Sequence, residues 1–242
     1  KVLIKNPGIN EKRAKLVALI EHLDDGIGKV VDALKKSGQY ENTIIVFTSD
    51  NGAEGSNIIL PNGGSLLAPW FDLVGYNSDY ETLGERGSWN AIGPSNATIA
   101  ASPLTYYKFH ANEGGLRVPL VISGPGIARI GDMTDEFTFV TDLAPTILSL
   151  VGVDGHEGSW QGRVVEPIVG ADFSKFLAGD SSPIHTDSEP IGYELGGNSA
   201  LFKGDYKIVI NGAGQGETAW HLFNIKADPG ESRDLAGEQP EL

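Results

Sequence analysis

TIIVFTSDNG, residues 43–52, is the stretch on which the predicted fold depends. Its first six residues form a continuous apolar, β-branched run, typical of a strand buried on both faces in a largely parallel sheet. The run follows residues 11–37, where apolar side chains recur every three or four positions as in an amphipathic helix. A second apolar run covers residues 118–123, and residues 142–151 predict another helix. The sequence therefore predicts an α/β core.

A different pattern occupies the C-terminal part. Residues 199–202 and 206–210 flank Lys203-Gly204-Asp205, a pattern typical of a β-hairpin, and residues 220–224 predict a third strand. These short strands indicate a small antiparallel sheet packed beside the α/β core. We assign it to a subdomain of residues 186–242.

The predicted core, residues 1–185, contains one long segment without clear periodicity. Residues 53–101 are rich in Gly, Asn, Ser and Pro, and we interpret them as an insertion, because structureless loops of that length are uncommon in compact domains. The first predicted helix is long and needs a surface to cover. We therefore expect that the chain lacks an upstream part.

Composition excludes several classes of partner. The chain has 18 Lys and Arg against 32 Asp and Glu, for a net charge of −14. This charge argues against a nucleic acid or an anionic membrane as the main partner. No run approaches the roughly 20 apolar residues that a membrane-spanning helix needs. With no cysteine, the chain has neither a thiolate metal site nor a cysteine nucleophile.

Asp50-Asn51-Gly52 directly follows the first predicted strand. Ligands of open α/β sheets collect at the carboxyl ends of strands, and carboxylate and amide oxygens suit hard cations such as Ca²⁺ or Mg²⁺. The alternative is an ordinary turn, since Asn-Gly is a common turn dipeptide. Two ligands also leave the shell of such a cation incomplete.

A second cluster, KFHANEGGLRVP at residues 108–119, precedes the second predicted strand. Cations beside a glycine pair can hold a tetrahedral anion, with Lys108 acting as a point charge. The alternative is a surface loop in which Glu113 and Arg117 fix the loop's own geometry, with His110 serving a structural role. The remaining histidines lack the spacing of a zinc site, and Asn96-Ala97-Thr98 matches a glycosylation acceptor.

Taken together, these motifs resemble the sulfatase family within the alkaline-phosphatase-like superfamily. The resemblance rests on HLDDGIGKVVDAL (residues 22–34), TSDNG (48–52), residues 108–119, TDLAPT (141–146), KGDYK (203–207), LFNI (222–225) and DPGE (228–231). Their order matches the family over nearly the whole chain apart from residues 53–101. The implied fold is part of a largely parallel sheet flanked by helices, followed by a small C-terminal antiparallel sheet.

The resemblance also implies roles for individual residues. It makes Asp50 and Asn51 two ligands of the active-site cation, usually Ca²⁺ with Mg²⁺ as an alternative, and Lys108 the catalytic lysine that contacts the sulfate group. Glu113, Arg117 and Pro119 become structural residues of the loop.

The family's nucleophile is a formylglycine made from Cys or Ser in a Cys/Ser-x-Pro-x-Arg motif. That motif is missing here, because Ser181-Ser182-Pro183 lacks the required arginine. The chain therefore resembles the C-terminal half of a sulfatase, and we expect it to be inactive alone.

The resulting hypothesis is metal-assisted hydrolysis of a small-molecule or glycan sulfate ester by a longer protein that includes the missing N-terminal half. One alternative is a phosphodiesterase or phosphonate monoester hydrolase of the same superfamily, and another is a non-catalytic binding or structural module. We expect a periplasmic or extracellular location in preference to a cytoplasmic one.

Overall fold

The computed structural model describes residues 7–55, 68–77, 79–82, 84–89, 91–156, 158–212 and 219–242. Spatial proximity divides the chain into two units. The first unit comprises Lys1–Ala33, Ser49–Pro119 and Ile191–Leu242, and the second comprises Leu34–Thr48 and Leu120–Pro190. The C-terminal residues thus share a unit with residues 49–119, and the domain boundary expected from the sequence between residues 185 and 186 stays a prediction.

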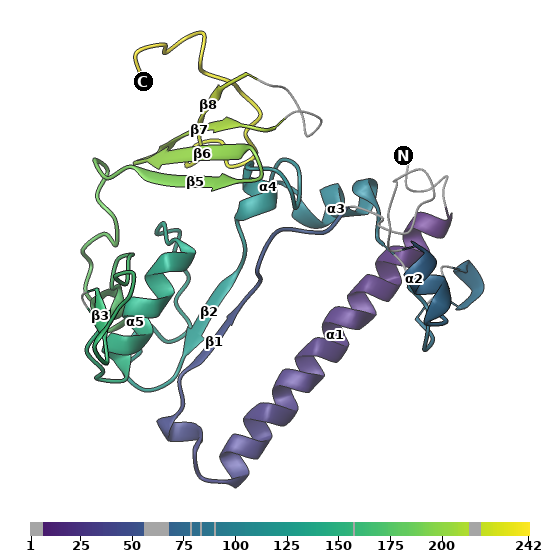
Figure 1. The fold of residues 1–242 in the computed structure, drawn as a ribbon, viewed down its shortest axis with the longest axis horizontal. Coiled ribbons are helices and arrows are strands. Elements are labelled where there is room, and N and C mark those ends of the chain that lie inside the picture. The colour runs from purple at the N-terminus through teal and green to yellow at the C-terminus, as the bar shows by residue number, and fades with distance from the viewer. Residues whose placement is uncertain are drawn as a thin grey trace. The chain divides into compact units, whose positions relative to one another are not determined.

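The second unit contains the two strands that the apolar runs predict. β1 (Ile45–Thr48) and β2 (Leu120–Ser123) pair antiparallel, with Ile45 opposite Ser123 (Figure 1). The sequence indicated a largely parallel sheet, but an apolar run reports burial and says nothing about the direction of its partner. The burial on both faces expected from the apolar run is not seen among the described residues, where Phe47 and Val121 are exposed, because no described segment covers them.

The buried carboxylate of Asp142 joins three segments of the second unit. That side chain accepts hydrogen bonds from the backbone N–H groups of Phe139 (2.7 Å) and Ala171 (2.8 Å) and lies 2.8 Å from His185 Nε2. It thereby helps fix the start of α5, which begins at Leu143, one residue inside the predicted helix of residues 142–151. The unit's short elements are η2 (Tyr40–Asn42), β3 (Ser159–Trp160), β4 (Arg163–Val164), η5 (Val140–Asp142), α5 (Leu143–Leu150) and α6 (Ser174–Leu177).

The long helix α1 (Pro7–Lys36) starts in the first unit and ends in the second. It begins with a proline, whose missing N–H would lack a helical partner in any case. Ile20, Leu23 and Val30 of its apolar stripe are each more than half exposed within the described residues. The first unit also contains α2 (Ala68–Leu73), η4 (Tyr80–Thr82), α3 (Pro94–Ala101) and α4 (Glu113–Leu116). The segment predicted as an insertion therefore has helical turns in its described part.

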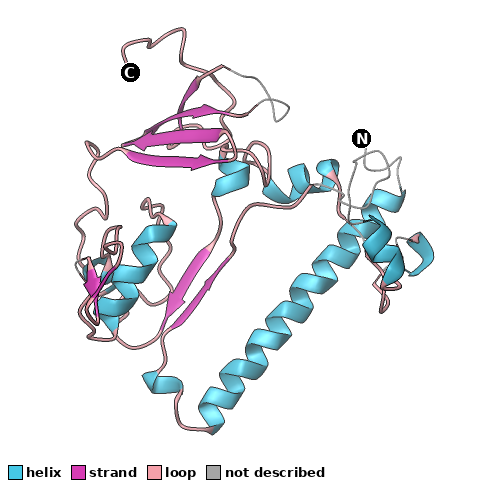
Figure 2. Ribbon diagram, viewed as in Figure 1, coloured by secondary structure: helices cyan, strands magenta, loops and turns pink. Residues whose placement is uncertain are grey.

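The first unit contains the predicted antiparallel sheet, drawn in magenta near the C-terminus in Figure 2. Its order is β5-β6-β7-β8, for β5 (Ile191–Leu195), β6 (Asn198–Lys203), β7 (Tyr206–Ile210) and β8 (His221–Asn224). Sequence patterning missed β5, which contains Gly192 and ends at a pair of glycines with left-handed backbone, residues that weaken a strand pattern.

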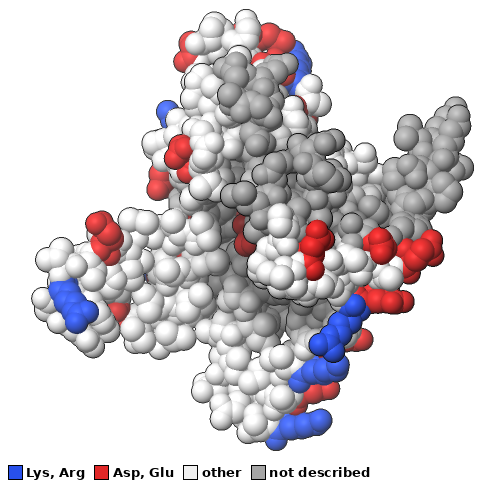
Figure 3. Space-filling view, turned by 45° about the vertical axis from the view of Figure 1, so that its right-hand side comes forward, with Lys and Arg blue, Asp and Glu red and all other residues white. Residues whose placement is uncertain are grey.

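A membrane-spanning helix is not found in the part of the chain that the structure describes. None of the described helices combines the length and the apolarity that crossing a bilayer requires. On the face that Figure 3 shows, Lys and Arg side chains are interspersed with Asp and Glu side chains.

Candidate active site

The predicted metal ligands lie in a tight turn that follows β1. Ser49 Oγ donates to the Asn51 carbonyl (3.0 Å), and Asn51 Nδ2 donates to the Gly52 carbonyl (2.9 Å). Since Asn51 Nδ2 donates its hydrogen bond within the turn, the side-chain oxygen Oδ1 is the Asn51 atom that can bind a cation. Asp50 is exposed and Asn51 is half-buried. The turn predicted as the alternative is therefore present, and it is compatible with ligand donation by both side chains.

This turn lies directly against the loop of residues 105–117, which we call the Lys108 loop. The Gly52 N–H donates to the Gly115 carbonyl (2.9 Å), and the Lys108 N–H donates to the Ala53 carbonyl (3.0 Å). A Cβ atom at Gly52 would lie 1.9 Å from the Gly114 carbonyl oxygen, which is too short for a contact between two non-bonded heavy atoms. Glycine is therefore required at position 52, and it brings the segment after Asp50-Asn51 into contact with the loop that bears the lysine.

The Lys108 ammonium contacts one acidic and one aromatic side chain. Its Nζ lies 2.9 Å from Glu54 Oε2 and 5.2 Å from the centre of the Phe109 ring. The side chains of Lys108 and Glu54 are 32% and 40% exposed, so the ammonium remains accessible. An ammonium has three N–H donors, which lets it keep Glu54 and still donate to an anion.

Two residues that flank Lys108 have left-handed backbone, Tyr106 with φ 62° and Phe109 with φ 75°. Non-glycine residues in this region cost about 1–3 kcal/mol and persist where the surroundings enforce them. The His110 side chain contributes to that enforcement: its Nδ1 lies 3.0 Å from the Tyr107 carbonyl oxygen, and its ring stacks on Tyr106 at 4.5 Å. His110 is nearly buried, in agreement with the structural role considered for it.

Glu113 is buried, and its carboxylate holds the Lys108 loop to the C-terminal sheet. Lys207 of β7 donates from Nζ to Glu113 Oε1 and to Glu231 Oε1, each at 2.9 Å. Arg117 lies farther away, with 3.8 Å between its Nη1 and Glu113 Oε2, and it is exposed. The interpretation that Glu113 shapes the loop therefore agrees with the structure, although its strongest partner is a lysine that sequence analysis did not select.

The cluster of Lys207, Glu113 and Glu231 has unusual electrostatics. All three side chains are almost completely buried, and with every group ionised the cluster would carry one net negative charge. Burial raises the pKa of the Glu231 carboxyl. This effect outweighs the neighbouring Lys207 ammonium, which by itself would lower that pKa. The sequence contained one signal for Lys207, namely a lysine within an otherwise apolar strand. Residues two apart share a face of a strand, and the structure shows that Lys207 and Val209 are both buried.

The other sequence candidates lie apart from this chemistry. Asn96 of the glycosylation motif lies in α3 and is buried, and its Nδ2 donates to the Ile92 carbonyl (2.8 Å). The Asn96 side chain is therefore not accessible as a glycosylation acceptor in this structure. His185 and His221 each pair with an aspartate. No cluster of three or more His, Cys, Asp or Glu side chains suited to a metal is found among the described residues.

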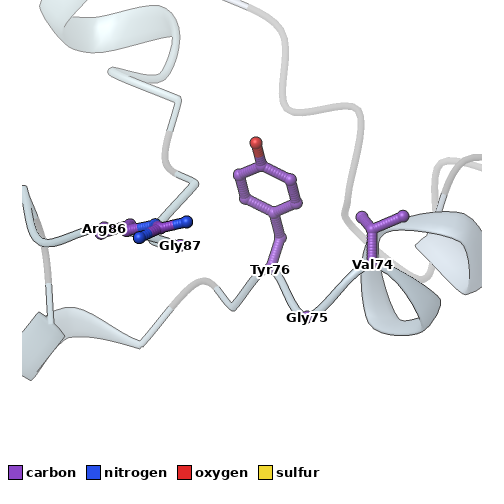
Figure 4. Close-up of a pocket in the computed structure, with 5 residues that line it drawn as sticks. All are labelled: Val74, Gly75, Tyr76, Arg86 and Gly87. Carbon is purple, nitrogen blue, oxygen red and sulfur yellow. The ribbon is translucent and has the colours of Figure 1, made fainter.

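A cavity of about 350 Å³ lies within the predicted insertion. Val74, Gly75, Tyr76, Arg86 and Gly87 line it, and Figure 4 shows the Tyr76 side chain between Val74 and the segment that carries Arg86. Residues predicted for the active site are not part of this lining.

Comparison with known proteins identifies the family. The sulfatase family's sequence model matches residues 5–153. An uncharacterized sulfatase of Schizosaccharomyces pombe is 36% identical over 93% of this chain and 40% of its own length. An arylsulfatase of Klebsiella aerogenes is 32% identical over 65% of this chain and 33% of its own. The chain belongs to the sulfatase family.

Solved structures support the same assignment. The crystal structure of Ps i-CgsB in complex with k-i-k-neocarrahexaose superposes with a TM-score of 0.58 and 27% identity, covering 90% of this chain and 37% of that one. The predicted α/β alkaline-phosphatase-like fold class with a C-terminal antiparallel sheet is thereby confirmed. The chain spans about 40% or less of the length of these relatives.

Proposed function

We propose that this chain is the C-terminal part of a sulfatase that hydrolyses a sulfate ester, R–O–SO₃⁻ + H₂O → R–OH + HSO₄⁻. The contact between the segment after Asp50-Asn51 and the Lys108 loop carries the proposal, because it brings the turn that bears two oxygen donors against the loop that bears an accessible ammonium. The family match and the arylsulfatase relative support it.

We assign Asp50 and Asn51 as two ligands of a divalent cation, Ca²⁺ in the first place and Mg²⁺ as the alternative. Their carboxylate and amide oxygens fit a hard cation, which takes six or more oxygens. The described residues supply only part of such a shell, so further ligands must come from elsewhere. When bound, the cation would polarise the sulfate oxygens.

Lys108 would bind the sulfate and neutralise charge near the leaving oxygen. A unit charge pair 4 Å apart interacts by about 4 kcal/mol at an effective dielectric constant of 20. The net charge of −14 repels an anionic ester at long range, but salt screens that repulsion beyond about 8 Å. Local charge at the site therefore outweighs the charge of the whole chain.

Uncovered apolar surface supports the proposal that a further part of the protein completes the core. Ile20 and Val30 of α1 are about 60% exposed, and Val121 of β2 is 56% exposed. Exposed apolar surface on this scale marks a surface that another part or partner covers. We propose that this part contains the formylglycine nucleophile and the remaining metal ligands, and that the substrate is a small-molecule or glycan sulfate ester.

The test compares two proteins: the chain of 242 residues alone and the full-length protein, meaning this chain together with the upstream coding sequence. We expect the full-length protein to release sulfate from an aryl sulfate and the chain alone to release none. A preference for phosphodiesters or phosphonate monoesters would replace the sulfatase proposal with the related hydrolase. The family resemblance also implies two metal-binding aspartates near the start of the full-length protein. An upstream sequence that lacks both these aspartates and the Cys/Ser-x-Pro-x-Arg motif would favour a non-catalytic module.

A further inference from the structure

The Lys108 loop is held by the C-terminal sheet at two buried points. The first is the Lys207 ammonium, which bonds to Glu113 and Glu231 at 2.9 Å each. Glu231 also accepts the Glu113 backbone N–H through its second carboxylate oxygen (2.9 Å). Lys207 therefore ties the start of α4 to two segments that lie about a hundred residues away in sequence.

The second point is Asn211, which directly follows β7. Its Oδ1 accepts the Ala111 N–H (2.9 Å), and its Nδ2 donates to Asn112 Oδ1 (2.8 Å). Asn211 and Asn112 are both buried, so water does not substitute easily for these bonds. Ala111 is three residues from Lys108, which places this anchor within one turn of chain from the catalytic candidate.

On its other side the loop is bound to the segment that follows the metal ligands. Gly52 and Ala53 make backbone hydrogen bonds to Gly115 and Lys108, and Glu54 pairs with the Lys108 ammonium. The loop is thus hydrogen-bonded both to the C-terminal sheet and to the turn after β1. A group that contacts a reacting atom must be held to within about 0.5 Å, and such precision requires supporting contacts of this kind.

We propose that Lys207 is a positioning residue for Lys108: through Glu113 it sets where the Lys108 ammonium stands relative to Asp50 and Asn51. The proposal rests on the proposed function. Without the Lys207 ammonium, the two buried carboxyl groups lose the cation that joins them, and one of them must take up a proton or move away from the other. Either response releases Glu113 from β7, and with it Lys108, five residues upstream.

The experiment uses the full-length protein with two variants of different severity. Lys207→Met removes the ammonium and leaves two buried carboxylates, so it carries a risk of misfolding. Asn211→Ala removes only the neutral contacts to Ala111 and Asn112. The matched control is Lys226→Met, which removes a lysine from an exposed, 3.5 Å ion pair with Asp205 beside the same sheet.

The readout is kcat/KM for a series of aryl sulfates whose leaving phenols differ in pKa, measured with each variant in the wild-type and Lys108→Ala backgrounds. We expect Lys207→Met to lower kcat/KM about 100-fold, with the largest losses for poor leaving groups, because a small misplacement of a catalytic group has that scale of effect. Asn211→Ala should act in the same direction and Lys226→Met should change nothing. In the Lys108→Ala background the loss should nearly disappear.

A structural role alone predicts different results. It predicts a loss that is uniform across leaving groups and is the same in the Lys108→Ala background; either result overturns the proposal. Hydrogen exchange of residues 105–117 supplies an independent measure, because Lys207→Met and Asn211→Ala should speed exchange there, and unchanged exchange also overturns the proposal. A wild-type full-length protein that hydrolyses no sulfate ester refutes the proposed function, while the exchange measurement still decides whether Lys207 holds the loop.

Discussion

The close approach of Gly52 to the Lys108 loop predicts that Gly52→Ala is strongly destabilising. The added Cβ would lie 1.9 Å from the Gly114 carbonyl oxygen and 3.1 Å from Gly115 Cα. Both are backbone atoms, so the clash is relieved only when the two segments move apart.

The cost follows from the contacts that such a movement loses. Overpacking of this kind costs about 1–3 kcal/mol. The hydrogen bonds from Gly52 to Gly115 and from Lys108 to Ala53 would lengthen or break, at about 1 kcal/mol each. The free energy of unfolding should therefore fall by about 3–5 kcal/mol, a large fraction of the roughly 5–15 kcal/mol that a domain possesses.

The assay is urea unfolding of the full-length protein, followed by circular dichroism, with Gly237→Ala as the matched control. A Cβ at Gly237 meets no atom of the described residues within 4 Å. This control should change the unfolding free energy by less than about 1 kcal/mol, toward higher stability, because alanine restricts the unfolded chain. Equal unfolding free energies for the two variants would refute the close approach and the site built on it.

Three further predictions concern individual side chains. Glu54→Gln in the full-length protein should lower kcat/KM by about two- to fivefold, the scale of a partly exposed ion pair, and an unchanged value would show that Glu54 does not orient Lys108. Burial opposes the charged form of His185, but the hydrogen bond and charge of Asp142 prevail and raise its pKa above the usual 6.5. The stabilisation of the folded state by protonated His185 is therefore complete below pH 6.5 and is lost as the pH rises through the raised pKa. His185→Gln should consequently lower the free energy of unfolding in urea more at pH 5.5 than at pH 8.5. Titration calorimetry of the 242-residue chain should show weak Ca²⁺ binding or none; tight binding abolished by Asp50→Ala would contradict the partial shell.

Local elements could be predicted because their causes are local. The apolar period of α1, the hairpin at Lys203-Gly204-Asp205 and the strand before Asp50 each depend on side chains a few positions apart. The motifs also identified the family, which the family match confirms.

Long-range contacts left weak signals in the sequence. The sequence shows Lys207 as a lysine within an otherwise apolar strand, but it does not show the partner, because Glu113 lies 94 residues away. Strand pairing is equally non-local, which is why the antiparallel direction of β1 and β2 was not foreseen. Asn96 matched a glycosylation motif, and its burial emerged only from the packing of α3.

The order of the amino acids by itself determined the family, the main helices and strands, and the residue types able to bind a cation and an anion. The tertiary structure alone decided that Gly52 allows the Lys108 loop to pack against the Asp50-Asn51 turn, and that Lys207 binds this loop through Glu113. The physical reason is that propensity and periodicity act between neighbouring residues, whereas close packing and buried charge pairing depend on segments that only folding brings together.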